Sequence, residues 1–428
     1  MATFAPAAVV PQLVAASALT QLNRLSVFPR AAQGNYEPTA FQKGDSVTVR
    51  RARIVKSQDY DPRSGTPANS YEPGYMSDTL TLERLWTAGF PVFGHDNRDS
   101  ATKYVSEYGE QIAQAIIVDN DDYFYNKFRT VTVPSVGAVA YGAQPPVGIV
   151  AAQNKGQIAE FNKQLLINSA TVLNRNNTPI NNRYAIFSSA AGGGFLGDSV
   201  LVEGFNATSV GAGQILQSGM APGIFVPRYG FQCSSSNAVG SQVGQPNIGA
   251  GPTLGITTVA TNALFTIPDF YNTTLLGALD FTLASAPQNV AVGQIAKIAP
   301  DTGDIVAFGL VLRVSGSVVT LVPFSPQGTQ LFPEQINPAT HKFSIPTIPS
   351  ISVAYHRESL IFATRNLALP SDGSGATAMT MADESTGLVV QVFRGGYRVD
   401  EFRESQRYAM LIGALLTDQR KACLMLSL

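Results

Sequence analysis

The sequence predicts an α+β fold that combines a mixed body, one long helix, an extended two-stranded loop and an inserted all-β barrel. Three observations favour it. Residues 98–128 carry apolar and aromatic side chains at three- and four-residue steps, which is typical of a helix. Residues 41–90 contain two strand-like segments separated by a turn-rich stretch. Residues 227–348 hold short strands, frequent turns and few charges, which indicates a small barrel or sandwich.

The composition is that of a chain with a large core, and it excludes several classes of protein. Of the 428 residues, 45% are hydrophobic and only 14% are charged, so disorder is excluded as the main state. The length gives a prior of about three domains. A net charge of −1 argues against a protein whose main task is to grip phosphate backbones. Two cysteines and three histidines leave little material for a disulfide framework or a structural zinc site.

Residues 1–40 are predicted to form an N-terminal arm. Apolar residues in this segment fall near helical spacing until Pro29 ends the pattern. Because no Lys or Arg precedes Arg24, and Pro6 and Pro11 interrupt the apolar run, the segment makes a poor secretory signal. We therefore expect synthesis in the cytosol and reduced cysteines. No run of 18 apolar residues occurs, so no membrane-spanning helix is expected.

The loop 41–90 joins a predicted strand at 47–55 to another at 78–85. An isolated two-stranded hairpin is only marginally stable in water, so this one must lie on its own body or on a neighbour. A basic cluster on the loop could contact nucleic acid, but aromatic partners for bases are limited to Tyr60 and Tyr71. Contact with an acidic neighbouring subunit is preferred, because complementary charge sets register and partner choice. The cluster comprises Arg50, Arg51, Arg53, Lys56 and Arg63.

The long helix 98–128 can be capped by Asp99 or Ser100, and about thirty helical residues span roughly 45 Å. An acidic run falls in its second half. Calcium sites need a turning loop, whereas consecutive helical residues point in different directions, so a solvated or partner-facing acidic patch is preferred over a cation site. The acidic candidates for contact between subunits are Asp119, Asp121 and Asp122.

The rest of the chain reads as a mixed body interrupted by the β-rich block. Only 9 of the 123 residues in 226–348 are charged, which marks the block as an insertion whose flanking halves complete each other. A second helix is expected over 158–172 and a flexible tip over 192–197. A short helix is expected around 360–362. The predicted strands cover 183–187, 279–283, 295–298, 306–314, 318–322, 351–355, 388–393, 407–413 and 422–426.

Residues that could carry chemistry do not form a convincing active site. The glycines of 192–197 match a dinucleotide fingerprint by letter, but no helix is expected to start directly after them. His95, His341 and His356 could each act as a base, yet there is no Gly-x-Ser-x-Gly elbow to supply a nucleophile. No catalytic, cofactor-binding or metal residue is predicted, and we expect that the chain is not an enzyme.

Several short strings accompany this order of parts: residues 95–100 before the long helix, 277–324 in the barrel, and 406–413 and 420–422 near the end. Together they resemble the major capsid proteins of tailed double-stranded DNA phages, the Hong Kong ninety-seven coat fold. Within that family the chain is most similar to the short-tailed P-twenty-two type, whose coat proteins carry an inserted β-barrel. The order in that family is arm, two-stranded loop, long spine helix, α/β body and late strands that rejoin the spine.

The resemblance implies a division of the chain into segments with named roles. The spine helix and the closing strands form a peripheral domain, and the α/β body forms an axial domain that meets around five- and six-fold centres. The segments are the arm 1–40, the extended loop 41–90, the spine and first peripheral part 91–145, the first axial part 146–226, the inserted barrel 227–348, the second axial part 349–387 and the closing peripheral strands 388–428.

The same resemblance implies a function and a set of partners. The chain would assemble with itself, as pentamers and hexamers, into an icosahedral head enclosing double-stranded DNA, which lies on the inner face without sequence-specific contact. A scaffolding protein, a portal protein and a decoration or cement protein are the implied partners, with no membrane and no cofactor. The location is the virion, after assembly in the host cytoplasm. The low charged fraction agrees independently, because interface cores are depleted in Lys, Glu and Asp.

Two alternatives remain open at this stage. Another virion structural protein, such as a tail or baseplate component, shares the low charge and the β content but does not need the long helix. A β-rich carbohydrate-active or proteolytic hydrolase needs paired acids in a cleft, which the sequence does not single out.

Overall fold

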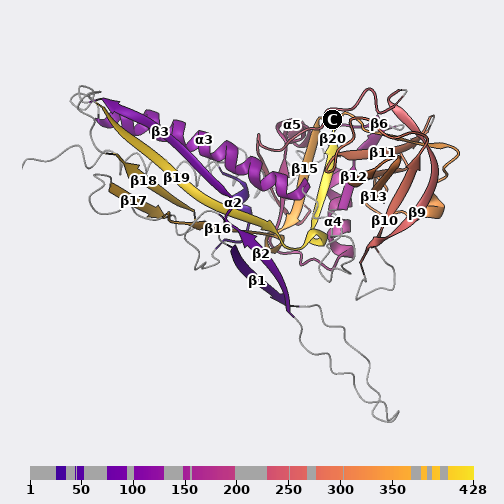
Figure 1. Ribbon diagram of the computed structural model, residues 1–428, viewed down its shortest axis with the longest axis horizontal. Coiled ribbons are helices and arrows are strands. Elements are labelled where there is room, and N and C mark those ends of the chain that lie inside the picture. Colours follow the sequence, from indigo (N-terminus) through magenta and orange to yellow (C-terminus); the bar gives the residue numbers. More distant parts are fainter. Residues whose placement is uncertain are drawn as a thin grey trace, which may run out of the picture.

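The computed structural model is a mixed α and β fold with many strands and few helices (Figure 1). Figure 1 shows an elongated molecule, with one sheet and the long helix α3 at one end, a second sheet in the middle and a barrel at the other end. The structure describes residues 26–34, 44, 46–52, 75–93, 101–129, 148–154, 157–197, 229–249, 251–267, 276–301, 303–367, 377–382, 388–395 and 403–428.

The first sheet is built around the long strand β19 (Arg403–Leu416). β3 (Arg84–Phe93) pairs along one edge of β19, and β18 (Val389–Arg394) and β16 (Leu360–Arg365) pair end to end along its other edge. β17 (Thr377–Ala382) extends the sheet beyond β18. The helix α3 (Ala101–Arg129) lies along this sheet and contacts β3 and β19 (Figure 1).

The second sheet has the strand order β4-β20-β15-β7-β8. Its alternate side chains enter two different cores, as the two-residue period of a strand requires. One face packs on the helices α4 (Lys163–Arg175) and α5 (Ser189–Gly197), and the other face packs towards α3 and the barrel. The strands are β4 (Gly148–Ala151), β20 (Ala422–Ser427), β15 (Ser350–His356), β7 (Arg183–Phe187) and β8 (Phe231–Ser235).

Six strands form a closed barrel in the order β10-β13-β12-β11-β14-β9. Its interior is filled by apolar side chains such as Phe281, Leu321 and Phe343, all fully buried. Outward-facing residues of β12 and β13, including Phe308 and Val322, join the main core of the body. The barrel therefore shares apolar surface with the rest of the chain. The strands are β9 (Thr253–Ile267), β10 (Leu276–Leu283), β11 (Ile295–Pro300), β12 (Ala307–Ser315), β13 (Val318–Phe324) and β14 (His341–Ser344).

Aromatic rings fill the place where helix, sheets and N-terminal segment meet. Phe28, in the short helix α2 (Phe28–Ala31), stacks on Phe124 of α3 and on Tyr355 of β15, with centroid separations of 6.4 and 6.5 Å. Phe128 lies 4.9 Å from Tyr355, and Phe124 meets Phe362 of β16 edge to face at 5.5 Å. Aromatic pairs at these separations add stabilisation to the area that they bury.

Shorter elements complete the described chain. The hairpin strands β1 (Ser46–Ala52) and β2 (Tyr75–Thr81) pair with each other, as do β5 (Gln153–Asn154) and β6 (Gln157–Ile158). Three 3-10 turns are η3 (Pro333–Gln335), η4 (Arg357–Ser359) and η5 (Gln419–Lys421).

Several predicted elements differ from the structure. The expected single strand at 78–85 is divided at Leu82–Glu83 into β2 and β3, because the chain leaves the hairpin there and joins the first sheet. The glycine-rich segment 192–197 is helical, because Ala191 and Phe195, four residues apart, bury their side chains against Phe161 and Phe187. The predicted arm helix lies outside the described residues.

Two segments also lie in a different sheet from the one expected. The segment 360–362 was predicted as a helix in the axial part, but it belongs to strand β16 of the first sheet, since its residues pair with β19 and are all buried. The strand 422–426, predicted among the closing peripheral strands, lies between β4 and β15 in the second sheet. Strand pairing over such distances in sequence is decided by tertiary packing and not by local pattern.

The base of the hairpin crosses the first sheet at a glycine. Val49, Leu80 and Leu82 pack against Ile361 and Leu411 of the sheet. A Cβ atom at Gly413 would overlap the carbonyl oxygen of Thr81, so this crossing requires the absence of a side chain on β19. Glycine at this position therefore sets how closely the hairpin approaches the sheet.

We predict that Gly413→Ala destabilises the folded chain by about 1–3 kcal/mol, because the added methyl group must push the backbone of the hairpin base away from β19. Chemical denaturation followed by circular dichroism measures the loss. Gly193→Ala is the control, because a Cβ at this helical position meets nothing within 4 Å. Equal effects of the two substitutions would contradict the close crossing.

Candidate functional site

The β1–β2 hairpin is the first candidate surface. Within the described part of the chain neither strand pairs with a third, and Figure 1 shows the pair leaving the body side by side. Val49 and Leu80 are buried at its base, so the hairpin is held on the first sheet at one end. A two-stranded sheet gains little stability from its own pairing, which leaves its strand edges available to another chain.

The structure describes only two of the five residues in the predicted basic cluster. Arg50 and Arg51 belong to β1, opposite Ser77 and Met76 of β2. The other three members, Arg53, Lys56 and Arg63, lie outside the described residues. Contact of this cluster with an acidic neighbour stays a prediction.

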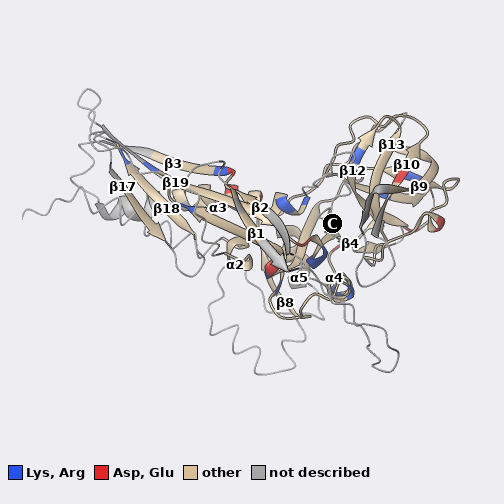
Figure 2. Cartoon of the chain, turned by 60° about the horizontal axis from the view of Figure 1, so that its bottom comes forward, with Lys and Arg blue, Asp and Glu red and all other residues tan. Residues whose placement is uncertain are grey.

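The outer face of α3 is the second candidate surface. Asp119 and Asp122 are exposed on it, beside Val118, which is 58% exposed. Asn126, one helical turn after Asp122, donates a hydrogen bond to the Asp122 carboxylate at 3.1 Å. Figure 2 shows that Lys, Arg, Asp and Glu occupy short, scattered stretches of the described chain and not one continuous face. These two carboxylates could therefore form only a local acidic contact.

Asp121 does not belong to that surface, and the prediction that it contacts a neighbouring subunit is wrong for this conformation. Its side chain is 2% exposed and points into the molecule. Ser26 Oγ donates to Asp121 Oδ1 at 2.9 Å, Ser236 Oγ donates to Oδ2 at 3.1 Å, and the Val27 N–H points to Oδ2 at 3.4 Å. The carboxylate joins three segments of its own chain.

The helical period of α3 could have revealed this placement. Positions four residues apart on a helix share a face. Ile117 precedes Asp121 by four residues and Tyr125 follows by four, and both are buried. The charge of the acidic run alone does not distinguish its three carboxylates. Their spacing from the apolar residues of the helix indicates that Asp121 faces inward.

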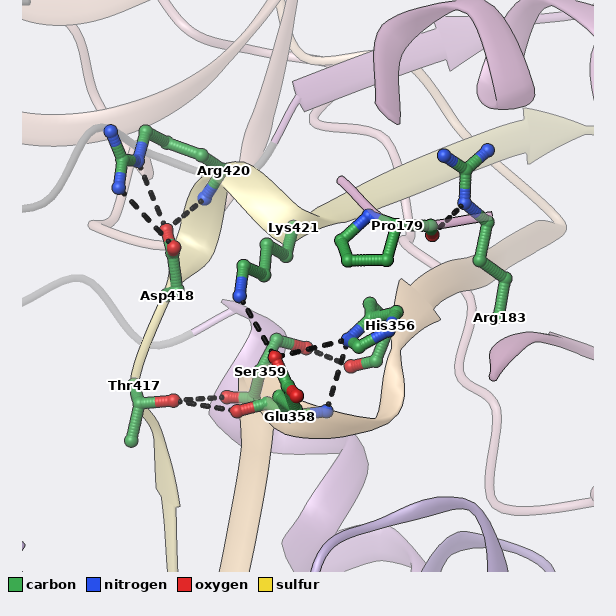
Figure 3. A network of polar contacts seen from close by, with 9 residues as sticks. All are labelled: Pro179, Arg183, His356, Glu358, Ser359, Thr417, Asp418, Arg420 and Lys421. Carbon is green, nitrogen blue, oxygen red and sulfur yellow. Dashed lines mark hydrogen bonds and ion pairs between the residues drawn. The ribbon is translucent and has the colours of Figure 1, made fainter. Parts of the chain in front are cut away.

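A polar network ties together the two places where the chain crosses between the sheets (Figure 3). One crossing runs from β15 through η4 to β16, and the other runs from β19 through η5 to β20. Thr417 at the second crossing donates its hydroxyl to the carbonyl oxygens of Glu358 and Ser359 at the first, at 2.9 and 3.1 Å. Its backbone N–H also donates to the Ser359 carbonyl at 2.7 Å.

His356 lies at the centre of this network and is 3% exposed. Burial lowers the pKa of its imidazole, and the nearby Glu358 carboxylate partly opposes the shift. The ring nitrogen Nδ1 accepts a hydrogen bond from the Glu358 backbone N–H at 3.3 Å, which a neutral ring can do. Lys421 Nζ lies 3.1 Å from Glu358 Oε2 and adds an ion pair at the surface.

Arg183 completes the site from the neighbouring strand β7. Its residue is 2% exposed, and its guanidinium donates to the carbonyl oxygens of Pro179 at 2.7 Å and Thr178 at 2.5 Å and to the Asn174 side chain at 2.8 Å. The arginine thus supplies donors to three acceptors, of which only the Thr178 carbonyl belongs to a buried residue. The guanidinium thus ties β7 to the end of α4 and to the turn that follows it, and Figure 3 shows its bond to Pro179.

The remaining candidates for chemistry are separate from this network. His341 lies in the barrel strand β14, where its Nδ1 accepts from the Asn337 backbone N–H at 3.1 Å, and His95 lies outside the described residues. The glycines of 192–197 are inside α5 and do not precede its start. Cys233 and Cys423 are both buried.

Among the described residues no group of three or more His, Cys, Asp or Glu side chains could hold a metal ion. No described helix has the length and apolar character needed to cross a bilayer.

No protein-family model matches this sequence, and no curated protein matches it either. Similar solved structures do exist. The capsid structure of the cyanophage P-SCSP1u shares 8% identity over 94% of this chain and 88% of its own, with a TM-score of 0.45. A structure from Mycobacterium phage Che8 shares 10% identity over 94% of this chain and 90% of its own, at 0.43. The capsid of an empty GTA particle shares 11% identity over 93% and 88%, at 0.42.

We predict that Arg183→Ala destabilises the chain by about 1–3 kcal/mol, because it leaves the buried Thr178 carbonyl without its donor. Lys421→Ala should cost at most about 1 kcal/mol, since exposed ion pairs contribute little. Urea unfolding of both variants measures the difference. A Lys421 variant as unstable as the Arg183 variant would contradict the expectation that the exposed ion pair stabilises the chain less than the buried guanidinium does.

Proposed function

We propose that this chain is a coat protein that assembles with copies of itself into a closed shell, as the major capsid protein of a tailed double-stranded DNA phage. The observation that carries the proposal is the β1–β2 hairpin, anchored at its base on the first sheet and joined to no third strand among the described residues. Such a hairpin gains a stable environment when it lies across an adjacent subunit.

Two further features support the proposal. The low charged fraction of 14% suits a subunit that buries much of its outer surface against identical neighbours. The polar network at the two chain crossings braces the sheets against each other, which suits a part that bears load in a wall. Each contact in a shell can be weak, because many contacts made together raise the effective concentration of each.

The roles of the segments follow the resemblance described above and are proposals. The loop 41–90 reaches the next subunit, and the barrel within 227–348 aids folding of the subunit and adds contacts between capsomers. Pentamers and hexamers form an icosahedral head, with the first sheet and α3 as the peripheral part. A scaffolding protein, a portal protein and a decoration or cement protein are the proposed partners, and packaged DNA meets the inner face without sequence specificity.

The first prediction concerns assembly itself. Purified full-length protein is expected to form closed shells or polyheads in negative-stain electron micrographs, with a matching fast boundary in sedimentation velocity. Tubes would favour the tail-component alternative. A monomer or a small discrete oligomer at high concentration would contradict the coat-protein proposal.

The second prediction concerns the hairpin charges. The triple variant Arg50→Ala, Arg51→Ala and Arg53→Ala should lower the yield of particles and weaken its dependence on salt, because about 0.5–1 kcal/mol is lost per exposed ion pair and the loss recurs at every copy. Sedimentation at two salt concentrations measures both effects. Arg313→Ala, at an exposed position of β12, is the control. A triple variant with the yield and salt dependence of the unmodified chain would refute the proposed acidic contact.

A further inference from the structure

Residues 26–34 form a segment that is docked onto the body by contacts of several kinds. Phe28 is fully buried among the rings of α3 and β15. The Gln33 N–H donates to the Leu360 carbonyl at 2.9 Å, and the Phe362 N–H donates back to the Gln33 carbonyl at 3.1 Å. Arg357 Nε donates to the Ala32 carbonyl at 3.1 Å. The segment thus adds a short bridge to the edge of β16.

The other end of this segment is held by the Asp121 carboxylate, which is buried without a cation. Ser26 and Val27 donate to it from the docked segment, and Ser236 donates from the turn that follows β8. None of the ion pairs formed by described residues involves Asp121. Hydroxyl and amide donors offset only part of the cost of burying a carboxylate, so the docked state favours the neutral acid.

The groups that face Asp121 offer no alternative charge. From β15 comes Tyr355, whose buried hydroxyl has no hydrogen-bond partner among the described residues and whose pKa burial raises well above its usual value. From the docked segment come Ser26 and Val27, while Arg30 is exposed. From α3 itself the neighbouring carboxylate, Asp122, lies on the outer face. Asp121 is therefore the titratable group of this site at moderate pH.

We propose that Asp121 is a proton-dependent latch: its carboxyl holds residues 26–34 on the body when protonated and favours their release when ionised. The two states differ in solvation. In the docked state the carboxyl is buried and reached only by hydroxyl and backbone amide donors, whereas in the released state water reaches it and hydrates the charge.

The titration of the group supports this latch and fixes the direction. Burial is the main cause that raises the pKa of Asp121 from 3.8 to about 6, and the Ser26 and Ser236 hydroxyls and the Val27 amide oppose it. The pKa of Asp121 is higher in the docked state than in the released state. The free energy that the neutral carboxyl contributes to docking is therefore complete below pH 3.8 and is lost as the pH rises through 6. With these values the ratio of docked to released segment is about tenfold higher at pH 5 than at pH 8.

One other group near the segment titrates in the opposite sense. His356 adjoins Arg357, which donates to Ala32, and burial lowers the pKa of its imidazole. As the pH falls below the usual pKa of histidine, protonation of His356 is favoured by unfolding and lowers the stability of the body around it. The two effects are separable, because substitution of Asp121 removes one and leaves the other.

Hydrogen–deuterium exchange of peptides spanning residues 26–34 tests the latch on the full-length protein, with rates corrected for the intrinsic effect of pH and the assembly state held constant by sedimentation. Protection of the segment is expected to fall about tenfold between pH 5 and pH 8. Asp121→Asn, an isostere that cannot ionise, should keep the protection high and independent of pH over this range. At pH 8 its protection should exceed that of the unmodified chain by about a hundredfold, the full factor that a rise in pKa from 3.8 to about 6 implies.

Two further variants keep the proposal falsifiable if the Asp121 variant folds poorly. Ser236→Ala removes a donor that favours the ionised form, so the midpoint of release should move to higher pH. Asp304→Asn, at an exposed barrel position, should behave as the unmodified chain. Protection of 26–34 that is constant from pH 5 to pH 8, or that keeps its pH dependence in Asp121→Asn, overturns the latch. This test does not depend on whether the chain forms shells.

Discussion

The architecture depends on the burial of one face of α3. Along that face Ile112, Ile116, Phe124 and Phe128 pack into a single core that also takes side chains from both sheets, from the barrel and from the segment at Phe28. Because each of these parts buries apolar surface on the same helix, none reaches its full stability without the others. A helix that served only its own sheet would not connect the two ends of so elongated a molecule.

The polar braces complement this apolar core at a different place. The core joins the parts in the interior, whereas Thr417, hydrogen-bonded to the Glu358 and Ser359 carbonyls, links the two short connections through which the chain passes from sheet to sheet. Apolar contact is non-directional, so it permits sliding of one sheet on the other, and hydrogen bonds with defined geometry do not. Together they make the relative position of the sheets a property of the whole chain.

Much of the local structure could be predicted from the sequence. The long helix, predicted over 98–128, is α3 at Ala101–Arg129, and the strands expected at 295–298 and 318–322 are β11 and β13. These elements have strong local signals, namely helical periodicity and β-branched runs between turns. The partners of the strands could not be predicted, as β16 and β20 show, because pairing across hundreds of residues leaves no local pattern.

The candidate site was predicted less well than the fold. The polar network depends on Thr417, which is unremarkable in the sequence and gains its role only where the two crossings meet. The acidic run predicts one exposed patch that includes Asp121, whereas the helical period of α3 separates Asp121 from its exposed neighbours. The proposed partners of the basic hairpin residues belong to another copy of the chain, and the clustering of charge in one sequence does not identify them.

The pairing of β4 with β20 affects how the chain folds as it is made. Gly148 leaves the ribosome about 270 residues ahead of its partner Cys423, and loops of that length close slowly. Until then β4 has an open edge next to a half-built apolar layer, the kind of surface on which nascent chains aggregate and chaperones act. The second sheet can therefore be completed only after β20, close to the end of this sequence, has been synthesised.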